Sequence, residues 1–124
     1  MEYRSLGRTG VKVSPLCLGT DNFMDPTPEA DCERILNTAM DSGINLLNIG
    51  DVAANGEGER VIGRILKDNG RRNEMLIGRE FDILLEEHTD SIRPNEYGLS
   101  RLNVIRACEA SLKRLQTDYI DLYQ

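Results

Sequence analysis

The sequence is poor in the residues that build metal and redox sites. It contains three cysteines and one histidine among 124 residues, and no two cysteines are close enough to form a CxxC pair. We therefore expect Cys17, Cys32 and Cys108 to be buried, reduced side chains in a cytoplasmic protein, and we expect no metal site. The N-terminus lacks the apolar stretch of a signal peptide, and no apolar run approaches the roughly 20 residues of a membrane span.

Positive charge is also scarce. The chain has 15 Lys and Arg residues against 21 Asp and Glu residues, which gives a formal net charge of −6. Nucleic acids and anionic membranes are bound through basic patches, and the pair Arg71-Arg72 is too short to supply one. The composition therefore argues against both as partners. A hydrophobic content of 40% and this length are ordinary for one globular domain over residues 1–124.

Strand-like and helix-like segments alternate along the chain. A short hairpin turns at Gly7-Arg8-Thr9-Gly10, and three helices with one apolar face each separate four apolar strands. The expected strands are residues 16–18, 44–49, 75–78 and 119–123, and the expected helices begin near residues 27, 59 and 100. Such alternation predicts an α/β fold with a parallel sheet and outer helices. A doubly wound sheet and a TIM barrel both fit, and periodicity does not separate them.

Local signals mark the ends of these helices. Thr27 is suited to cap the first helix, with Pro28 at its first position, and Ser100 is suited to cap the third. Gly43 and Gly70 are expected to end the first and second helices in a left-handed conformation.

Three long stretches resemble one known family. "EYRSLGRTGVKVSPLCLGT" is similar to the opening hairpin and first strand of microbial aldo-keto reductases, and "ILNTAMDSGINLLN" resembles their first helix and second strand. "GLSRLNVIRACEASLKRLQTDYIDLYQ" is similar to their third helix and fourth strand. The resemblance implies the N-terminal portion of a (β/α)8 TIM barrel, with four of the eight strands, preceded by a β-hairpin.

The resemblance also implies a chemistry, the reduction of carbonyl compounds by NADPH. In this family a tyrosine donates the proton, a lysine and an aspartate lower its pKa from about 10, and a histidine orients the carbonyl. The aspartate position here is Asn48, the tyrosine position is Ala53 and the lysine position is Arg79. The histidine is expected two residues after Gln124, where the given sequence has already stopped.

Other residues offer little replacement chemistry. Asp51 is a poor proton donor at neutral pH, and we expect His88 to be a solvated loop residue. Tyr97 follows the third strand and could approach the site, whereas Tyr119 and Tyr123 should face the helices because of their strand parity.

The cofactor elements implied by the resemblance are Gly19, Thr20, Asp21 and Asn48. They offer backbone groups and no positive charge, so we expect weak or absent NADP binding. The function expected is that of a truncated, catalytically inactive member of the reductase family. The alternatives are a non-catalytic interaction module that self-associates, and an active reductase completed by a C-terminal half from elsewhere. Self-association is expected because Ile77, Ile120 and Leu122 have the parity of barrel-interior residues that lack partners.

Overall fold

The computed structural model describes residues 1–50, 53–81, 95 and 98–124. An antiparallel hairpin precedes a four-stranded parallel sheet whose strands are neighbours in the order in which the chain forms them. The hairpin consists of β1 (Arg4–Ser5) and β2 (Lys12–Val13), and the sheet consists of β3 (Leu18–Gly19), β4 (Leu46–Ile49), β5 (Leu76–Arg79) and β6 (Leu122–Tyr123). This sequential order confirms the predicted half-barrel topology, in which short β-α-β connections make consecutive strands neighbours.

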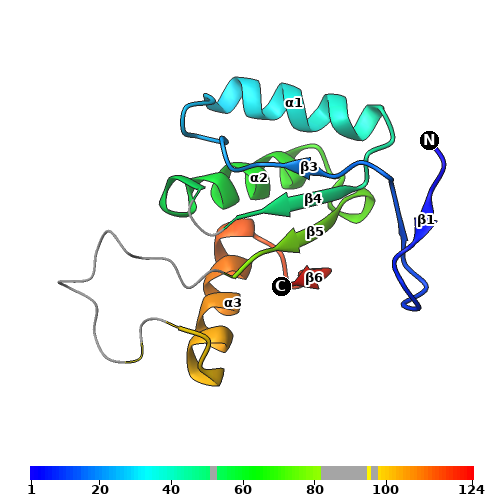
Figure 1. Cartoon of the computed structure of the whole chain (residues 1–124). Helices are drawn as coiled ribbons and strands as arrows, with labels where there is room; N and C mark the ends of the chain where they lie inside the picture. Colours follow the sequence, from blue (N-terminus) through cyan, green and yellow to red (C-terminus); the bar gives the residue numbers. More distant parts are fainter. Residues whose placement is uncertain (51–52, 82–94, 96–97) are drawn as a thin grey trace.

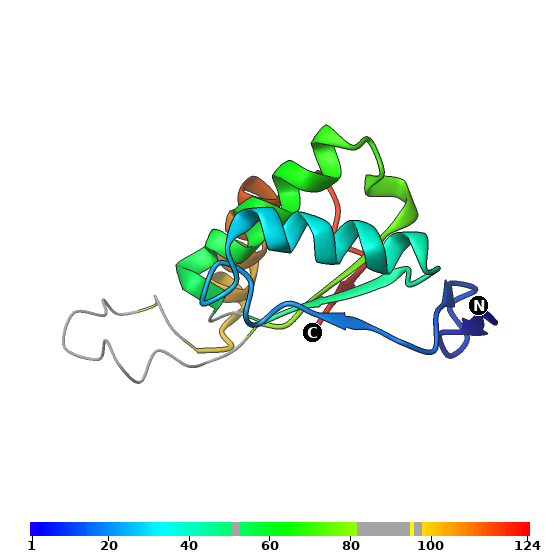
Figure 2. The ribbon, with the colours of Figure 1, turned by 90° about the horizontal axis from the view of Figure 1, so that it is seen from above.

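The helices α1 (Glu29–Asp41), α2 (Glu57–Asp68) and α3 (Arg101–Leu115) connect the strands. All three lie on one side of the sheet, and Figures 1 and 2 show no other described element against its opposite side. Two short 3₁₀ helices, η1 (Ala53–Gly56) and η2 (Arg72–Glu74), lie before α2 and before β5. We call the side of the sheet away from the helices the inner face.

The hydrophobic core fills the layer between the sheet and the helices. Leu47, Ile49 and Ile77 are completely buried there, together with Val61 and Ile62 of α2. The expectation that Ile77 faces the barrel interior was therefore wrong. Because Ile77 is the registered neighbour of Leu47, the two side chains lie on the same, helix-covered face.

The other two residues predicted to lie in the interior divide between the faces. Ile120 is partly buried against the core cluster, which also contradicts the prediction. Leu122 is the registered neighbour of Gly78 and is half-buried, so it shares the inner face with Gly78.

Most helix ends follow the predicted signals. Gly43 and Gly70 have φ angles of 87° and 70° just beyond the ends of α1 and α2, and the Ser100 hydroxyl accepts a hydrogen bond from the Asn103 amide over 3.2 Å. Thr27 does not cap α1. Pro28 is the capping residue, and proline has no side-chain group that could bond the free amides, while the Thr27 amide donates to the Asn22 carbonyl in the preceding turn.

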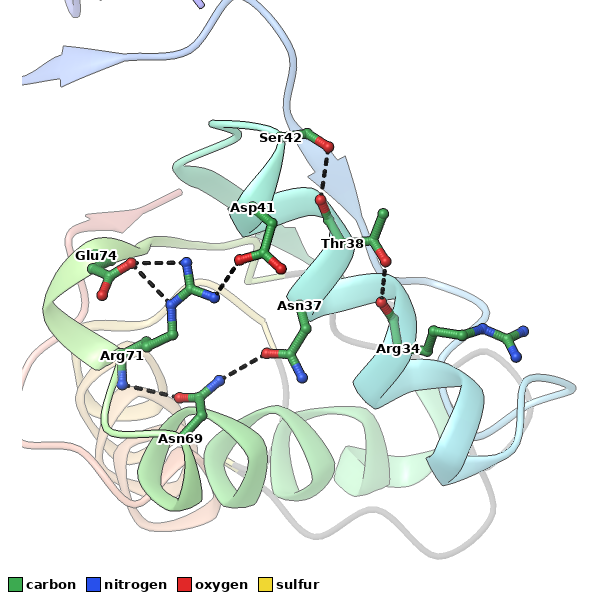
Figure 3. A network of polar contacts seen from close by, with 8 residues as sticks. All are labelled: Arg34, Asn37, Thr38, Asp41, Ser42, Asn69, Arg71 and Glu74. Atoms are coloured by element: carbon green, nitrogen blue, oxygen red, sulfur yellow. Dashed lines mark hydrogen bonds and ion pairs between the residues drawn. The ribbon is translucent and has the colours of Figure 1, made fainter.

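A polar network fixes α1 against the connection between α2 and β5 (Figure 3). Arg71 donates to Asp41 over 2.8 Å and to Glu74 over 2.9 Å, while Asn69 donates to Asn37 over 3.0 Å. The carboxylates of Asp41 and Glu74 are largely exposed, so these are surface ion pairs that contribute little to stability. The network lies at the edge of the sheet where the strands begin, and it orients α1 there.

The cysteines differ in their surroundings. Cys32 is buried as predicted, Cys108 is half-buried, and Cys17 is exposed, so the expectation of burial was wrong for Cys17. No helix in the described part of the chain is both long and apolar enough to cross a membrane.

Candidate functional site

The candidate site lies at the edge where the parallel strands end. In a parallel sheet all carboxyl ends meet at one edge, which is where barrels of this kind place their chemistry. The register places Gly19 beside Asn48, and Asn48 beside Gly78. The chain ends next to them, since the Gln124 amide donates to the Arg79 carbonyl over 2.9 Å. Residues from four strands therefore meet at this edge.

The turn after β3 is held by hydrogen bonds to β4. The backbone amide and the hydroxyl of Thr20 both donate to the Asn48 carbonyl, over 3.2 Å and 3.0 Å, and Thr20 is completely buried. Thr20 therefore has a structural role. Asp21 is exposed, and its Oδ1 would lie 2.7 Å from a Cβ built at Gly50. A side chain at position 50 would require this exposed carboxylate to move, whereas Gly19 faces open space.

Asn48 is the centre of a small polar cluster on the inner face. Its Nδ2 donates to Glu80 Oε1 over 2.9 Å, and its Oδ1 accepts from Gln124 Nε2 over 3.5 Å. A Cβ built at Gly78 would lie 3.6 Å from each of these Asn48 and Gln124 atoms, which places both side chains over Gly78. We call Asn48, Glu80 and Gln124 the inner-face cluster.

Arg79 does not belong to this cluster. Its side chain is 1% exposed and lies between the sheet and the helices, where Nε donates to Glu59 Oε1 over 2.8 Å and to Ser111 Oγ over 3.2 Å. Arg114 also binds Glu59 and donates to Ser111 over 3.2 Å. The expectation that Arg79 joins Asn48 at the site is not met, because adjacent residues of a strand point to opposite faces.

Glu80 and Gln124 are the site residues that the sequence analysis missed. Glu80 extends the ladder of β5, since its amide donates to the Ile49 carbonyl over 2.9 Å. Counting by twos along the strand puts Glu80 on the same face as Gly78, and the structure identifies that face as the inner one. From this position Glu80 acts on Cys17: desolvation raises the pKa of the Cys17 thiol, and the negative charge of Glu80 raises it further.

Several candidate residues cannot be placed. Asp51, His88 and Tyr97 lie outside the described residues, and only the backbone of Ala53 is described, at the start of η1. Within the described ranges, no group of three His, Cys, Asp or Glu side chains could hold a metal ion.

Comparison with known proteins identifies the family. The model of the aldo/keto reductase family matches residues 15–124. The chain belongs to this family. It is 40% identical over its full length to an uncharacterized oxidoreductase, YrpG, of Bacillus subtilis, and 33% identical over 98% of its length to a probable voltage-gated potassium channel subunit beta of Arabidopsis thaliana. It spans only 39% and 36% of these two proteins.

Solved structures of aldo-keto reductases confirm the fold. The chain superposes on the holo form of an aldo-keto reductase of Bacillus halodurans with a TM-score of 0.83 and 33% identity, covering all of this chain and 39% of that one. A putative aldo-keto reductase of Pseudomonas gives a TM-score of 0.79 at 34% identity. The described α/β unit is therefore the N-terminal portion of an aldo/keto reductase barrel, preceded by its hairpin.

Tyr119 precedes β6 and Tyr123 ends it. The Tyr119 hydroxyl donates to Asn73 over 3.0 Å, and the Arg72 guanidinium lies 3.9 Å from the Tyr119 ring centre. Tyr119 is nevertheless exposed. Tyr123 is the registered neighbour of Arg79 and so lies on the helix side, as its parity predicted. Neither tyrosine stands over the inner-face cluster.

Proposed function

We propose that this chain is a member of the aldo/keto reductase family that does not reduce carbonyl compounds as it stands. The single observation that carries the proposal is the residue at the tyrosine position, Ala53, which begins η1 five residues beyond Asn48. Alanine has no proton to donate to a developing alkoxide. Loss of a general acid typically costs 10²- to 10⁴-fold in rate.

The charges at the strand ends support the same conclusion. The residues that follow the four strands in the described structure are Thr20, Asp21, Gly50, Glu80 and Gln124. They include two carboxylates and no cation, and Arg79 is engaged on the other face. The family cofactor, NADPH, carries several phosphate groups that need positive charge or free donors. The described part of the site does not fit those phosphates, and weak or absent binding of NADPH remains our proposal.

The test is a turnover assay of the purified chain. NADPH oxidation is followed at 340 nm with 4-nitrobenzaldehyde, beside a complete aldo-keto reductase as a positive control and a mock preparation as a negative control. We expect a rate equal to that of the mock. A rate that survives repurification and scales with the concentration of the chain would overturn the proposal.

A second candidate function is a non-catalytic assembly role, through self-association or through a separate C-terminal half. Within the described sheet, β3 and β6 each have one neighbouring strand, and Leu46, Leu76 and Leu122 are only half-buried. Open strand edges and uncovered apolar side chains favour pairing. The potassium channel subunit among the relatives carries the name of an assembly component. Light scattering at tens of micromolar tests this candidate, which predicts a dimer or larger species, and a stable monomer would contradict it.

A further inference from the structure

Arg79 and Glu80 are consecutive residues whose side chains lie on opposite faces of the sheet. Arg79 is buried against α2 and α3, with Glu59 and Ser111 as partners. Glu80 lies on the inner face, where it accepts a hydrogen bond from Asn48. In the family, the aspartate and the lysine act on the same tyrosine, so their side chains must lie on the same face of the sheet. Asn48 stands at the aspartate position, and Glu80 lies on the same face as Asn48 whereas Arg79 does not.

The backbone fixes this placement independently of the side chains. Glu80 is bonded to Ile49 on one side, and the following residue, Phe81, donates its amide to the Gln124 carbonyl over 2.8 Å on the other. The parallel ladder therefore continues past the end of β5 in unbroken register. A slip of one residue, which would exchange the two faces, would break these bonds.

We propose that Asn48 and Glu80 are the charge-exchanged counterpart of the family's aspartate and lysine pair, with Glu80 rather than Arg79 at the second position. The hydrogen bond between the two strands is kept, but its direction is reversed. A neutral amide on β4 donates, and a carboxylate after β5 accepts. This inference rests on the proposed function and deepens it. The negative charge of Glu80 would disfavour a negative charge that develops beside the pair during a reaction, whereas a lysine would favour it.

The pair at Asn48 and Glu80 differs in net charge from the aspartate and lysine pair of the family. A carboxylate beside a lysine gives a neutral pair whose ammonium stabilises a nearby phenolate, whereas an amide beside a carboxylate has a net charge of −1. The positive charge of Arg79 is already paired with Glu59 in the helix layer. Arg79→Lys is therefore expected to change the core and to leave the inner-face cluster as it is.

The test is a double-mutant cycle read by thermal unfolding of the whole chain at neutral pH. Asn48→Asp places two carboxylates at hydrogen-bonding distance and is expected to lower the Tm by about 3 °C or more. Adding Glu80→Lys is expected to recover at least half of this loss, because the two groups then attract. The matched control, Asn48→Asp with Arg79→Lys, is expected to show no recovery. Failure of Glu80→Lys to recover the Tm, or equal recovery by Arg79→Lys, would overturn the proposal.

A second measurement, the alkylation rate of Cys17, reports the charge at position 80 and not the stability of the fold. Glu80→Lys replaces the negative charge that raises the pKa of the Cys17 thiol by a positive one, so Cys17 alkylation by iodoacetamide at pH 8 should be at least about twofold faster. Arg79→Lys should leave the rate unchanged, and Cys17→Ser supplies the background from the other cysteines. An unchanged rate in Glu80→Lys would contradict the placement of Glu80. Turnover by the unmodified chain would instead defeat the proposed function and leave both measurements interpretable.

Discussion

Replacement of Arg79 by leucine tests whether Arg79 is a buried structural residue or an exposed residue of the site. The Arg79 side chain is 1% exposed and its main partner, Glu59, is 3% exposed, with 2.8 Å between Nε and Oε1. Removing one partner of a buried pair typically costs about 3–5 kcal/mol. Arg114 remains beside Glu59, so the lower end of that range applies, about 3 kcal/mol.

Urea denaturation followed by circular dichroism measures this cost. With m values of about 1–3 kcal/mol/M, a loss of about 3 kcal/mol moves the midpoint down by about 1–3 M. The control is Arg34→Leu, because the ion pair of Arg34 with Asp31 is exposed and contributes at most about 1 kcal/mol. If Arg79→Leu changes the unfolding free energy by less than about 0.5 kcal/mol, the change is that of an ordinary surface substitution, and the assignment of Arg79 to the helix layer is wrong.

Three further predictions follow from the packing and from the site. Glycine to alanine ordinarily stabilises a helix by about 1 kcal/mol. Gly63→Ala should instead destabilise the chain by about 1–3 kcal/mol, because the new Cβ would lie 2.5 Å from the Leu115 carbonyl oxygen. Thermal unfolding measures the sign of the change, and a higher Tm would contradict this prediction. Arg72→Ala should cost about 2–3 kcal/mol in urea denaturation, since Arg72 donates to the Tyr119 carbonyl and to Asp121 in a mostly buried position, and a loss below about 0.5 kcal/mol would contradict this. Calorimetric titration with NADPH should show no binding tighter than about millimolar, and a micromolar dissociation constant would refute the reading of the site.

The sequence predicted the order of the elements well because the signals are local. Glycines at helix ends and the apolar spacing of α2 are short-range features. Gly43 and Gly70 are found as predicted, and Val61 and Ile62 form part of the buried apolar face of α2. The family resemblance then distinguished a barrel from a doubly wound sheet, which periodicity had left open.

The faces of β5 could not be predicted in the same way. Leu76 and Ile77 are both apolar, so no alternation shows which of them faces the helices. A charged Arg79 also suggests a water-exposed site, because burial of an arginine requires partners. Those partners are Glu59 of α2 and Ser111 of α3, and their convergence on Arg79 becomes visible only in three dimensions.

The claim that this chain does not reduce carbonyl compounds is tested most directly by a single-turnover measurement of hydride transfer. The chain, at a concentration above that of the cofactor, is incubated with 4-nitrobenzaldehyde and NADPH deuterated at the transferred position, and the alcohol product is analysed by mass spectrometry. Because Ala53 supplies no proton and the described residues that follow the strands carry no positive charge, we predict no deuterated alcohol above that of a mock preparation. Deuterated alcohol formed in proportion to the amount of chain, and still formed after repurification, would contradict the account.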